Sequence, residues 1–464
     1  MVSDLECPAC DARYSAGADE PWRCGCGHAL EFVDQPYPEG EPLSLSNLDT
    51  SRGLWTFYEF LPIEPHVTLY EGFTPLVAAP DWDATFKLEY VFPTGSFKDR
   101  GATTTLSRAV ELGVETVIED SSGNAGAAIA TYAARAGLPA EIYVPAGVKQ
   151  SKLMAIQRVG ARPVRVEGSR EDVTAACVDA VEGGARLGGA VSDGDAIGDS
   201  DTNDDADADT DTDSDIGDDS DGDTGADDST TGDDVDTDAD NSDTDAEAET
   251  DSNIGADDDT DGGDETANES GHPDAPYQRG PGWYASHAWN PAFYAGTMTF
   301  AFELAAQREW TAPDAIVLPI GHGTLFLGAY RGFSILEDAG IVDRLPRLIG
   351  VQSAGFDPIV HAIDGDRFVE AGEGENGIAD GIQIREPARG TQILDAIEAT
   401  EGTAVAVGDG IVESALDRLH RGGFYVEPTA AVAPAALEPL READVLAPSE
   451  TVVVPLTGSG LKTL

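Results

Sequence analysis

The chain has 464 residues, enough for two or three domains with cores of ordinary size. Its 87 acidic and 27 basic side chains give a formal net charge of −60 at pH 7, and no basic patch is visible, which argues against a nucleic-acid partner. The sequence contains no stretch of about 18 consecutive apolar residues, so we expect no membrane span. The first residues lack the charged and apolar regions of a signal peptide, so we expect a cytoplasmic protein.

The negative charge is uneven along the chain. Residues 193–276 hold 35 of the acidic residues and no Lys or Arg, so the remainder keeps 52 acidic and 27 basic residues, a formal charge of −25. That excess is typical of halophilic proteins, whose carboxylates stay hydrated while salt screens their repulsion. The segment 191–277 has almost no large apolar side chains, and we predict a disordered acidic insert. Its irregular Asp spacing argues against specific calcium binding.

Residues 1–36 contain four of the five cysteines, and in a cytoplasmic protein such clustering favours a metal over disulfides. The pairs Cys7-x2-Cys10 and Cys24-x-Cys26 predict a structural zinc ribbon. The zinc would supply the folding energy that so short a segment cannot obtain from a core. The second pair is closer than in a typical ribbon, so redox or incidental thiols are the alternative. His28 could replace one ligand, although we expect it at the surface.

From residue 37 the chain is a Pro- and aromatic-rich linker with a short helix near 55–60, after which short apolar strands alternate with helices. We predict strands at 85–90, 116–119, 140–144 and 162–166, and helices at 102–112, 127–136, 149–159 and 170–187. After the insert, we predict helices at 295–309 and 325–336 and strands at 315–319, 348–352, 404–407, 424–426 and 451–455. This alternation predicts an α/β fold, with parallel sheets covered by helices on both faces and built from residues 37–190 and 278–464.

Lys98 is the first candidate catalytic residue. It follows the predicted strand 85–90 and a Pro/Gly turn, and it opens a predicted helix. A lysine at such a junction is held by the backbone and shielded, as a Schiff-base lysine must be if its amine is to be neutral part of the time. The alternative is a lysine at a helix start with no chemical role. Lys87, on the preceding strand, is predicted to face solvent and to be dispensable.

The turn after the strand 116–119 is a candidate anion site. It consists of Ser121, Ser122, Gly123 and Asn124. Its N–H groups and hydroxyls would lie at the positive end of the next helix, where a carboxylate or phosphate binds. The amide of Asn124 can also donate to a phenolate. The alternative is a tight loop without a ligand.

A second glycine turn follows the strand 315–319. It consists of Gly321, His322, Gly323, Thr324 and Leu325, and a predicted helix follows it. Free N–H groups between a strand and a helix are suited to a phosphate. A Gly-x-Gly pattern alone is a weak signal, and its position between these elements strengthens it.

Taken together, these stretches resemble the fold-type II pyridoxal-phosphate enzymes, the group that includes tryptophan synthase β chain, cysteine synthase, serine/threonine dehydratase and threonine synthase. The similarity is greatest to threonine synthases, and the four cysteines resemble the N-terminal ribbon of archaeal ones. The stretches that carry the resemblance are Glu71-Gly72-x-Thr74-Pro75-Leu76, 93–101, 121–126 and 456–462. It covers the chain apart from residues 191–276. It implies a two-domain core, pyridoxal 5'-phosphate as cofactor, a small amino-acid substrate and a homodimer.

The resemblance also implies roles for individual residues. Lys98 would form the Schiff base with the cofactor and move protons at the substrate carbons. Asn124 would bond the phenolic oxygen, the 321–325 turn would bind the cofactor phosphate, and the 121–124 turn would also bind the substrate carboxylate. Thr457 would meet the pyridine nitrogen. A hydroxyl there gives a milder electron sink than a carboxylate would, which favours elimination or replacement over transamination.

The implied reaction is that of threonine synthase, in which O-phospho-L-homoserine loses its γ-phosphate and water adds to give L-threonine. The alternatives are a serine/threonine dehydratase, a sulfur-adding synthase of the cysteine- or cysteate-synthase kind and, outside the enzymes, an acidic scaffold. The 321–325 turn and the C-terminal Thr457-Gly458-Ser459-Gly460-Leu461-Lys462-Thr463 differ from the usual threonine synthase motifs. Phosphohomoserine also needs a second anion site, for which Lys152, Arg158 and Arg331 are available cations.

Overall fold

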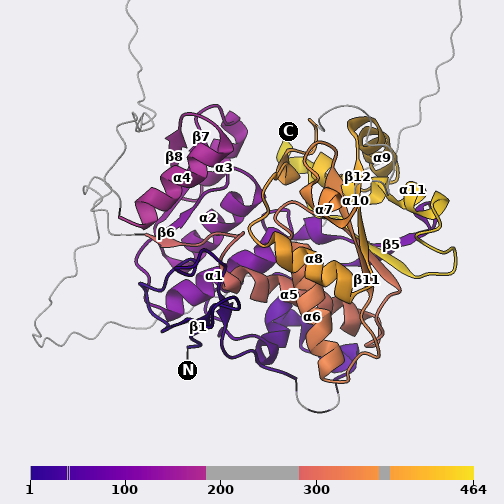
Figure 1. Cartoon of the computed structure of the whole chain (residues 1–464), viewed down its shortest axis with the longest axis horizontal. Coiled ribbons are helices and arrows are strands. Elements are labelled where there is room, and N and C mark those ends of the chain that lie inside the picture. The colour runs from indigo at the N-terminus through magenta and orange to yellow at the C-terminus, as the bar shows by residue number, and fades with distance from the viewer. Residues whose placement is uncertain (1, 39, 41, 184–281, 365–376, 464) are drawn as a thin grey trace, which may run out of the picture. The chain divides into compact units, whose positions relative to one another are not determined.

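The computed structural model describes residues 2–38, 40, 42–183, 282–364 and 377–463. The predicted acidic insert 191–277 lies outside the described residues. One sheet has four parallel strands (Figure 1), in the order β8 (Arg162–Val166), β7 (Ala140–Pro145), β6 (Val117–Glu119) and β9 (Trp283–Tyr284).

The second sheet has six strands. Their order is β12 (Thr403–Val407), β11 (Arg347–Ser353), β10 (Ala315–Pro319), β13 (Val452–Pro455), β5 (Ala84–Lys87) and β4 (Leu76–Ala79). All neighbours are parallel except β4 and β5. Every residue of β10 is buried, which explains why this strand is an uninterrupted apolar run.

Helices cover both faces of each sheet, as the alternation predicts. The helices are α1 (Lys98–Glu111), α2 (Asn124–Ala136), α3 (Gln150–Gln157), α4 (Arg170–Val181), α5 (Pro291–Gln307), α6 (Thr324–Asp338), α7 (Pro358–Asp364), α8 (Gly390–Ala399), α9 (Asp409–Arg421), α10 (Pro428–Ala435) and α11 (Leu437–Glu442). Side chains of α1 and α2 pack on one face of the four-stranded sheet and those of α4 on the other. The six-stranded sheet lies between α5, α6 and α8 on one face and α9 and α10 on the other.

Helix α5 lies at the centre of the fold, between α1 and α6 (Figure 1). All its residues from Pro291 to Ala306 are buried, so it has no polar face to present to water. It thereby joins the elements that carry Lys98 to those that carry the 321–325 turn. No helix among the described residues is long and apolar enough to cross a membrane.

The N-terminal segment forms a small antiparallel sheet of β1 (Leu5–Glu6), β2 (Arg13–Tyr14) and β3 (Glu31–Phe32). Glu31 fastens it to the core, because its carboxylate accepts from Arg331 of α6 at 2.6 and 2.9 Å and from Arg389 before α8. These cations outweigh burial and lower the pKa of Glu31 to about 2, so the contact is ionised at neutral pH.

Most predicted elements are present, but the helix predicted at 170–187 ends at Val181 and the one predicted at 295–309 spans Pro291–Gln307. Strand β9 and the helices α7 to α11 were not predicted. Residues 424–426 do not form a strand, because only Val426 pairs, through one bridge to Ser459. The strand predicted at 85–90 ends at Lys87 and is followed by a 3-10 turn, Glu89–Val91. Helix α1 begins at Lys98, earlier than expected. Its first turn is polar in sequence, but Asp99 and Arg100 of this turn are buried in the structure. The short helix near 55–60 is the 3-10 segment η2 (Thr50–Phe60).

Candidate active site

The chain around Lys98 is held by the C-terminal residues. The N–H of Phe97 donates to the carbonyl oxygen of Thr457 at 3.1 Å, and the N–H of Ser459 donates to that of Gly95 at 2.9 Å. Gly95 has a φ of 75°, the left-handed conformation that glycine adopts without strain. This pairing places the first residue of α1 beside the buried Thr457, two residues that lie far apart in the sequence.

The amine of Lys98 is in an apolar setting. Its Nζ lies 4.7 Å from the ring centroid of Phe97 and 5.6 Å from that of Phe293, and it donates to Thr324 Oγ1 at 3.1 Å. Burial lowers the pKa of Lys98 to about 7, although the charges of Glu119 and Glu427 oppose the shift. At neutral pH, a large fraction of this amine is therefore uncharged and nucleophilic.

Thr324 opens α6, and the glycine turn before it has the geometry of an anion cradle. Gly323 has a φ of 77°, and a Cβ there would lie 2.4 Å from Ile393 Cδ1. The Nδ1 atom of His322 is buried without a hydrogen-bond partner among the described residues. Burial lowers the pKa of His322 to about 3, so the ring is neutral. Gly321–Leu325 thus offers free N–H groups at a helix N-terminus, as a phosphate requires.

The Ser121–Asn124 turn leaves β6 and opens α2. Ser121 is buried and its Oγ accepts the N–H of Gly123 at 3.3 Å. Gly126 permits this tight turn, because a Cβ on it would lie 1.7 Å from the carbonyl oxygen of Ser121. The turn brings Asn124 toward the C-terminal residues near Lys98. The binding of a substrate carboxylate by Ser121, Ser122 and Gly123 remains a prediction.

Asn124 is held from both sides by charged residues that the sequence did not single out. Its Nδ2 donates to Glu427 Oε1 and its Oδ1 accepts from Lys462 Nζ, both at 2.6 Å. The ammonium of Lys462 can only donate, so the atom of Asn124 that faces it must be the amide oxygen, and this fixes the orientation of the amide. One of the two N–H groups on Nδ2 then remains free. Gly458 is required here, since a Cβ on it would lie 2.0 Å from Glu427 Oε1. Burial lowers the pKa of Lys462 and raises that of Glu427, and their mutual attraction opposes both shifts.

These residues fit pyridoxal phosphate. The amine of Lys98, with its lowered pKa, suits the aldehyde of the cofactor. The free N–H groups of the 321–325 turn suit its phosphate, and the spare N–H of Asn124 suits its phenolic oxygen. The sequence could have suggested Lys462, which lies within the C-terminal motif. No local signal marks Glu427, because its partner Asn124 lies 303 residues away.

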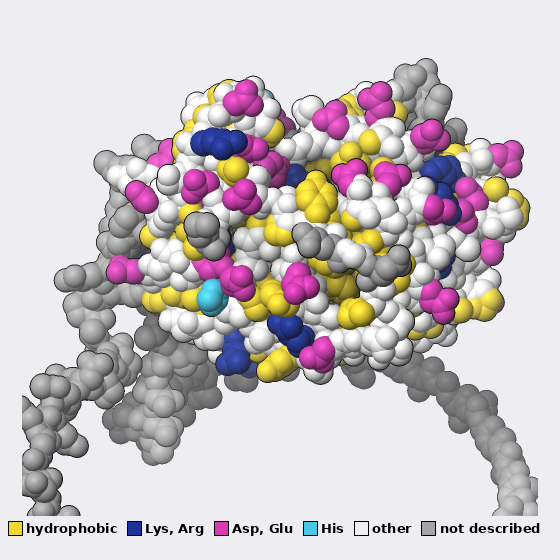
Figure 2. Space-filling model, turned by 90° about the horizontal axis from the view of Figure 1, so that it is seen from below, with side chains coloured by type: hydrophobic (Ala, Val, Ile, Leu, Met, Phe, Trp, Pro, Cys, Tyr) yellow, Lys and Arg dark blue, Asp and Glu magenta, His cyan; other side chains and the backbone are white. Residues whose placement is uncertain are grey.

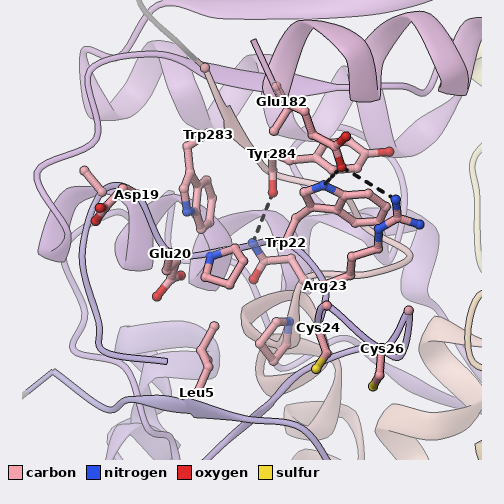
Figure 3. Close-up of a pocket in the computed structure, with 18 residues that line it drawn as sticks. Leu5, Asp19, Glu20, Trp22, Arg23, Cys24, Cys26, Glu182, Trp283 and Tyr284 are labelled. Carbon is pink, nitrogen blue, oxygen red and sulfur yellow. Dashed lines mark hydrogen bonds and ion pairs between the residues drawn. The ribbon is translucent and has the colours of Figure 1, made fainter. Parts of the chain in front are cut away.

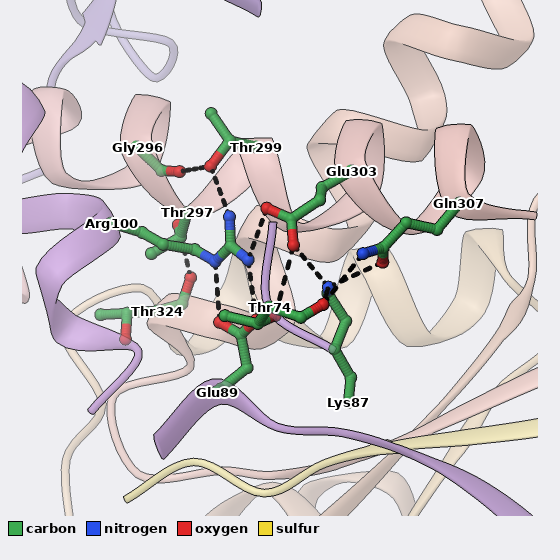
Figure 4. A network of polar contacts seen from close by, with 10 residues as sticks. All are labelled: Thr74, Lys87, Glu89, Arg100, Gly296, Thr297, Thr299, Glu303, Gln307 and Thr324. Atoms are coloured by element: carbon green, nitrogen blue, oxygen red, sulfur yellow. Dashed lines mark hydrogen bonds and ion pairs between the residues drawn. The ribbon is translucent and has the colours of Figure 1, made fainter. Parts of the chain in front are cut away.

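The structure corrects the prediction for Lys87. Its side chain is fully buried, and its Nζ donates to Glu303 Oε1 at 2.6 Å, to Gln307 Oε1 at 2.9 Å and to the carbonyl oxygen of Thr74 at 3.0 Å. Figure 4 shows Glu303 between Lys87 and the buried guanidinium of Arg100. The network joins β5, α1 and α5 next to Lys98, so Lys87 is a structural residue and cannot serve as a silent control.

The four cysteines of the ribbon converge. The sulfur atoms of Cys7, Cys10, Cys24 and Cys26 all lie within 4.8 Å of one another. The Cys7–Cys26 and Cys10–Cys24 sulfur pairs are each 3.5 Å apart. A tetrahedral zinc with bonds of about 2.3 Å holds its sulfurs roughly 3.8 Å apart, so this arrangement suits zinc. His28 is exposed, as expected, although its Nδ1 lies 3.4 Å from Cys26 Sγ.

A cavity of about 700 Å³ lies where the ribbon meets the core, and Figure 3 shows its lining. Trp22 packs edge-on against Tyr284, with ring centroids 5.4 Å apart, and its Nε1 donates to Glu182 Oε1 at 3.2 Å. Neither Lys98 nor Asn124 lines this cavity. It belongs to the attachment of the ribbon and not to the site around Lys98.

The three cations that the sequence offered for a second anion site have different positions. Arg331 is committed to Glu31 of the ribbon. Lys152 pairs with Asp380 at 2.8 Å. Arg158 is exposed at the end of α3.

Comparisons with known proteins agree with the family resemblance seen in the sequence. A family model described as pyridoxal-phosphate dependent enzyme matches residues 67–191 and 251–458. A threonine synthase of Methanocaldococcus jannaschii is 27% identical over 455 residues, which cover 95% of this chain and 88% of the relative. A threonine synthase of Methanosarcina acetivorans is 28% identical over 471 residues, with 99% and 92% covered.

Solved structures share the fold. A fungal L-serine ammonia-lyase from Rhizomucor miehei superposes with a TM-score of 0.53 at 20% identity, covering 83% of this chain and 93% of the other. Maize serine racemase superposes with a TM-score of 0.55 at 17% identity, covering 89% and 93%. The predicted fold-type II α/β architecture is thereby confirmed.

Proposed function

Because the chain belongs to the pyridoxal-phosphate-dependent enzymes, we propose that it is a threonine synthase, a lyase that converts O-phospho-L-homoserine and water to L-threonine and phosphate. The observation that carries the proposal is the position of Lys98, a partly buried residue whose amine has a pKa of about 7 and lies beside Thr324. The substrate is taken from the threonine synthases that match nearly the whole chain.

When bound, pyridoxal phosphate supplies an electron sink for carbanions at the substrate carbons. We assign the holding of its phosphate to the 321–325 turn, the contact to its phenolic oxygen to Asn124, and the contact to its ring nitrogen to Thr457. Lys98 accepts and returns protons at the α and β carbons, for which a pKa near the working pH is best. The Ser121–Asn124 turn holds the substrate carboxylate.

Product analysis tests this function. The holoprotein is incubated separately with O-phospho-L-homoserine, L-serine and L-threonine, and we expect L-threonine and phosphate in equal amounts from the first. A 2-oxo acid and ammonia from serine or threonine, with no threonine from phosphohomoserine, would instead identify a dehydratase. A replacement product formed only with a sulfur nucleophile would identify a synthase of the cysteine or cysteate kind.

We also propose that Cys7, Cys10, Cys24 and Cys26 bind one structural zinc. A site with four thiolates has no open coordination position, so it takes no part in the reaction. Metal analysis of protein purified without chelators is expected to find about one zinc per chain. Cys10→Ser is expected to unfold residues 1–36 and leave cofactor binding unchanged, and protein without zinc would refute the proposal.

We further propose a cytoplasmic homodimer, since the resemblance implies a dimer, and adaptation to high salt, which the acidic composition favours. For the division of the chain, we propose a ribbon at 1–36, a core in two parts at 37–190 and 278–464, and the acidic segment at 191–277. Size-exclusion chromatography with light scattering tests the dimer, and a monomer at micromolar concentration would contradict it.

A further inference from the structure

The proposed reaction releases an anion, and the cation that receives it has not yet been identified. Arg331 is neutralised by Glu31, Lys152 by Asp380, and Arg158 is exposed on α3. A cation that serves this role has to lie near Lys98, at the edge of the sheet from which the Ser121–Asn124 turn leaves. It also has to be free to pair with a ligand.

Arg170 meets the requirement of position. It is the first residue of α4, which follows β8, and in the parallel four-stranded sheet β8 and β6 end at the same edge (Figure 1). On α4, Thr174 Oγ1 donates to Asp120 Oδ2 at 2.6 Å, directly before the Ser121–Asn124 turn. Residues four apart share a helix face, so Arg170 lies one turn before Thr174, at the N-terminus of α4, on the face that contacts this edge.

Arg170 also meets the requirement of freedom. Its side chain is exposed and forms no ion pair or hydrogen bond with the residues that the structure describes. Its charge nevertheless reaches the site, since it helps to lower the pKa of Lys98, His287 and His322 after the larger effect of burial. The positive charge of Arg170 therefore disfavours protonation of these three groups, and an anion bound beside Arg170 would offset that charge.

His287 supplies a second donor in the same place. It is 5% exposed, and Glu119 Oε1 holds its Nδ1 at 2.6 Å, which turns Nε2 away from Glu119. Within the described part of the chain, Nε2 forms no hydrogen bond, and the ring stands edge-on to His322 with centroids 5.4 Å apart. Burial lowers the pKa of His287 and raises that of Glu119, which favours the neutral form of each side chain. A neutral imidazole bonded through Nδ1 to a protonated carboxyl carries its hydrogen on Nε2.

We propose that Arg170 and His287 form the subsite for the anionic γ-substituent of the substrate, an assignment that rests on the proposed function. When the bond between Cγ and the oxygen of the singly protonated phosphate group breaks, the electron pair stays on that oxygen and phosphate leaves as the dianion HPO4²⁻. The guanidinium of Arg170 pairs with the departing dianion in two parallel hydrogen bonds, and His287 Nε2–H donates to a third oxygen. The cofactor phosphate is held separately, by N–H groups of the 321–325 turn.

Inorganic phosphate is the probe, because it is the released product and needs no catalysis to bind. Holoprotein saturated with pyridoxal phosphate is titrated with phosphate and followed by calorimetry and by the cofactor absorbance. We expect Arg170→Gln to weaken phosphate binding about tenfold or more, Arg170→Lys to weaken it less, and the control Arg158→Gln to leave it unchanged. With O-phospho-L-homoserine, Arg170→Gln should raise KM by a similar factor and change kcat much less.

The outcomes separate this inference from the proposed function. Turnover of phosphohomoserine with an unchanged KM and unchanged phosphate binding in Arg170→Gln overturns the subsite and leaves the function intact. Arg170-dependent phosphate binding without threonine formation overturns the function and keeps the anion site. Weaker binding of pyridoxal phosphate with unchanged binding of inorganic phosphate would assign Arg170 to the cofactor instead, which also overturns the subsite.

Discussion

At the scale of single residues, the chemistry depends on how the protein tunes one amine. Lys98 and Lys87 are both lysines, and burial lowers the pKa of each. Lys87 is surrounded by Glu303, Gln307 and a carbonyl oxygen, which consume its donors. Lys98 has a threonine hydroxyl and two aromatic rings, so its amine is left for reaction.

The pKa of Lys98 sets how the apoprotein captures its cofactor. Because the neutral amine reacts, and its pKa is about 7 instead of 10.5, the neutral fraction rises with pH up to about 7 and then levels off. We expect the rate of cofactor capture, followed by visible absorbance, to rise about tenfold from pH 5 to 6 and to be nearly flat from pH 8 to 9. A rate that still rises about tenfold per unit above pH 8 would indicate an ordinary lysine.

Lys87 is expected to matter for stability. Lys87→Ala removes one of two cations from the buried Glu303, and breaking a buried pair costs about 3–5 kcal/mol. Urea unfolding should show this loss, while the exposed Lys149→Ala changes the free energy of unfolding by less than about 0.5 kcal/mol. Equal stability of the two variants would show that the network in Figure 4 contributes little.

At the scale of elements, the N-terminus of α6 depends on Gly323. Gly323→Ala would force a side chain against Ile393 in a left-handed conformation, and the turn would have to move. Gly340, after the end of the same helix, has a φ of 69° but open space around it. We expect Gly323→Ala to weaken pyridoxal phosphate binding about tenfold or more and Gly340→Ala to leave it unchanged. Fluorescence titration of the apoprotein measures this, and equal affinities would remove the turn from the cofactor site.

The regular elements could be predicted because they are locally encoded. Strand β10 is an apolar run that ends at a glycine turn, and its predicted bounds match the structure. The early start of α1 and the burial of Lys87 could not be predicted. Arg100 and Lys87 look like surface residues until their partner Glu303 is placed, 216 residues after Lys87. Residues 424–426 contain β-forming side chains, yet among the described residues only Val426 pairs, through a single bridge to Ser459.

Some residues of the candidate site could likewise be predicted from the sequence, and others could not. Lys98, Asn124 and the 321–325 turn could be singled out from strand–turn–helix patterns, and the structure places Lys98 beside Thr324 of that turn. Glu427 and His287 were not predicted, because their partners Asn124 and Glu119 lie far away in the sequence. The role proposed for Arg170 was not predicted either, because it depends on the edge of the sheet that α4 reaches. A lone histidine or arginine in a sequence carries no signal of the charges that it will meet.

At the scale of the whole molecule, the excess of carboxylates has an energetic cost at low salt. Figure 2 shows acidic side chains spread over one face, with few basic ones among them. Since the formal charge is −60, we expect the melting temperature to rise with KCl, mostly below about 1 M, where the Debye length falls to about 3 Å. A melting temperature that is flat or falls over this range would contradict adaptation to salt.

The assignment of Lys98 as the catalytic lysine is tested most directly by trapping the cofactor. Holoprotein is reduced with borohydride, digested, and analysed by mass spectrometry for a phosphopyridoxyl group on each of the five lysines. We expect the label on Lys98 alone, with loss of the visible absorbance, and no label in Lys98→Ala. A label on Lys87, Lys149, Lys152 or Lys462 instead, or none at all, would contradict the assignment and the mechanism built on it.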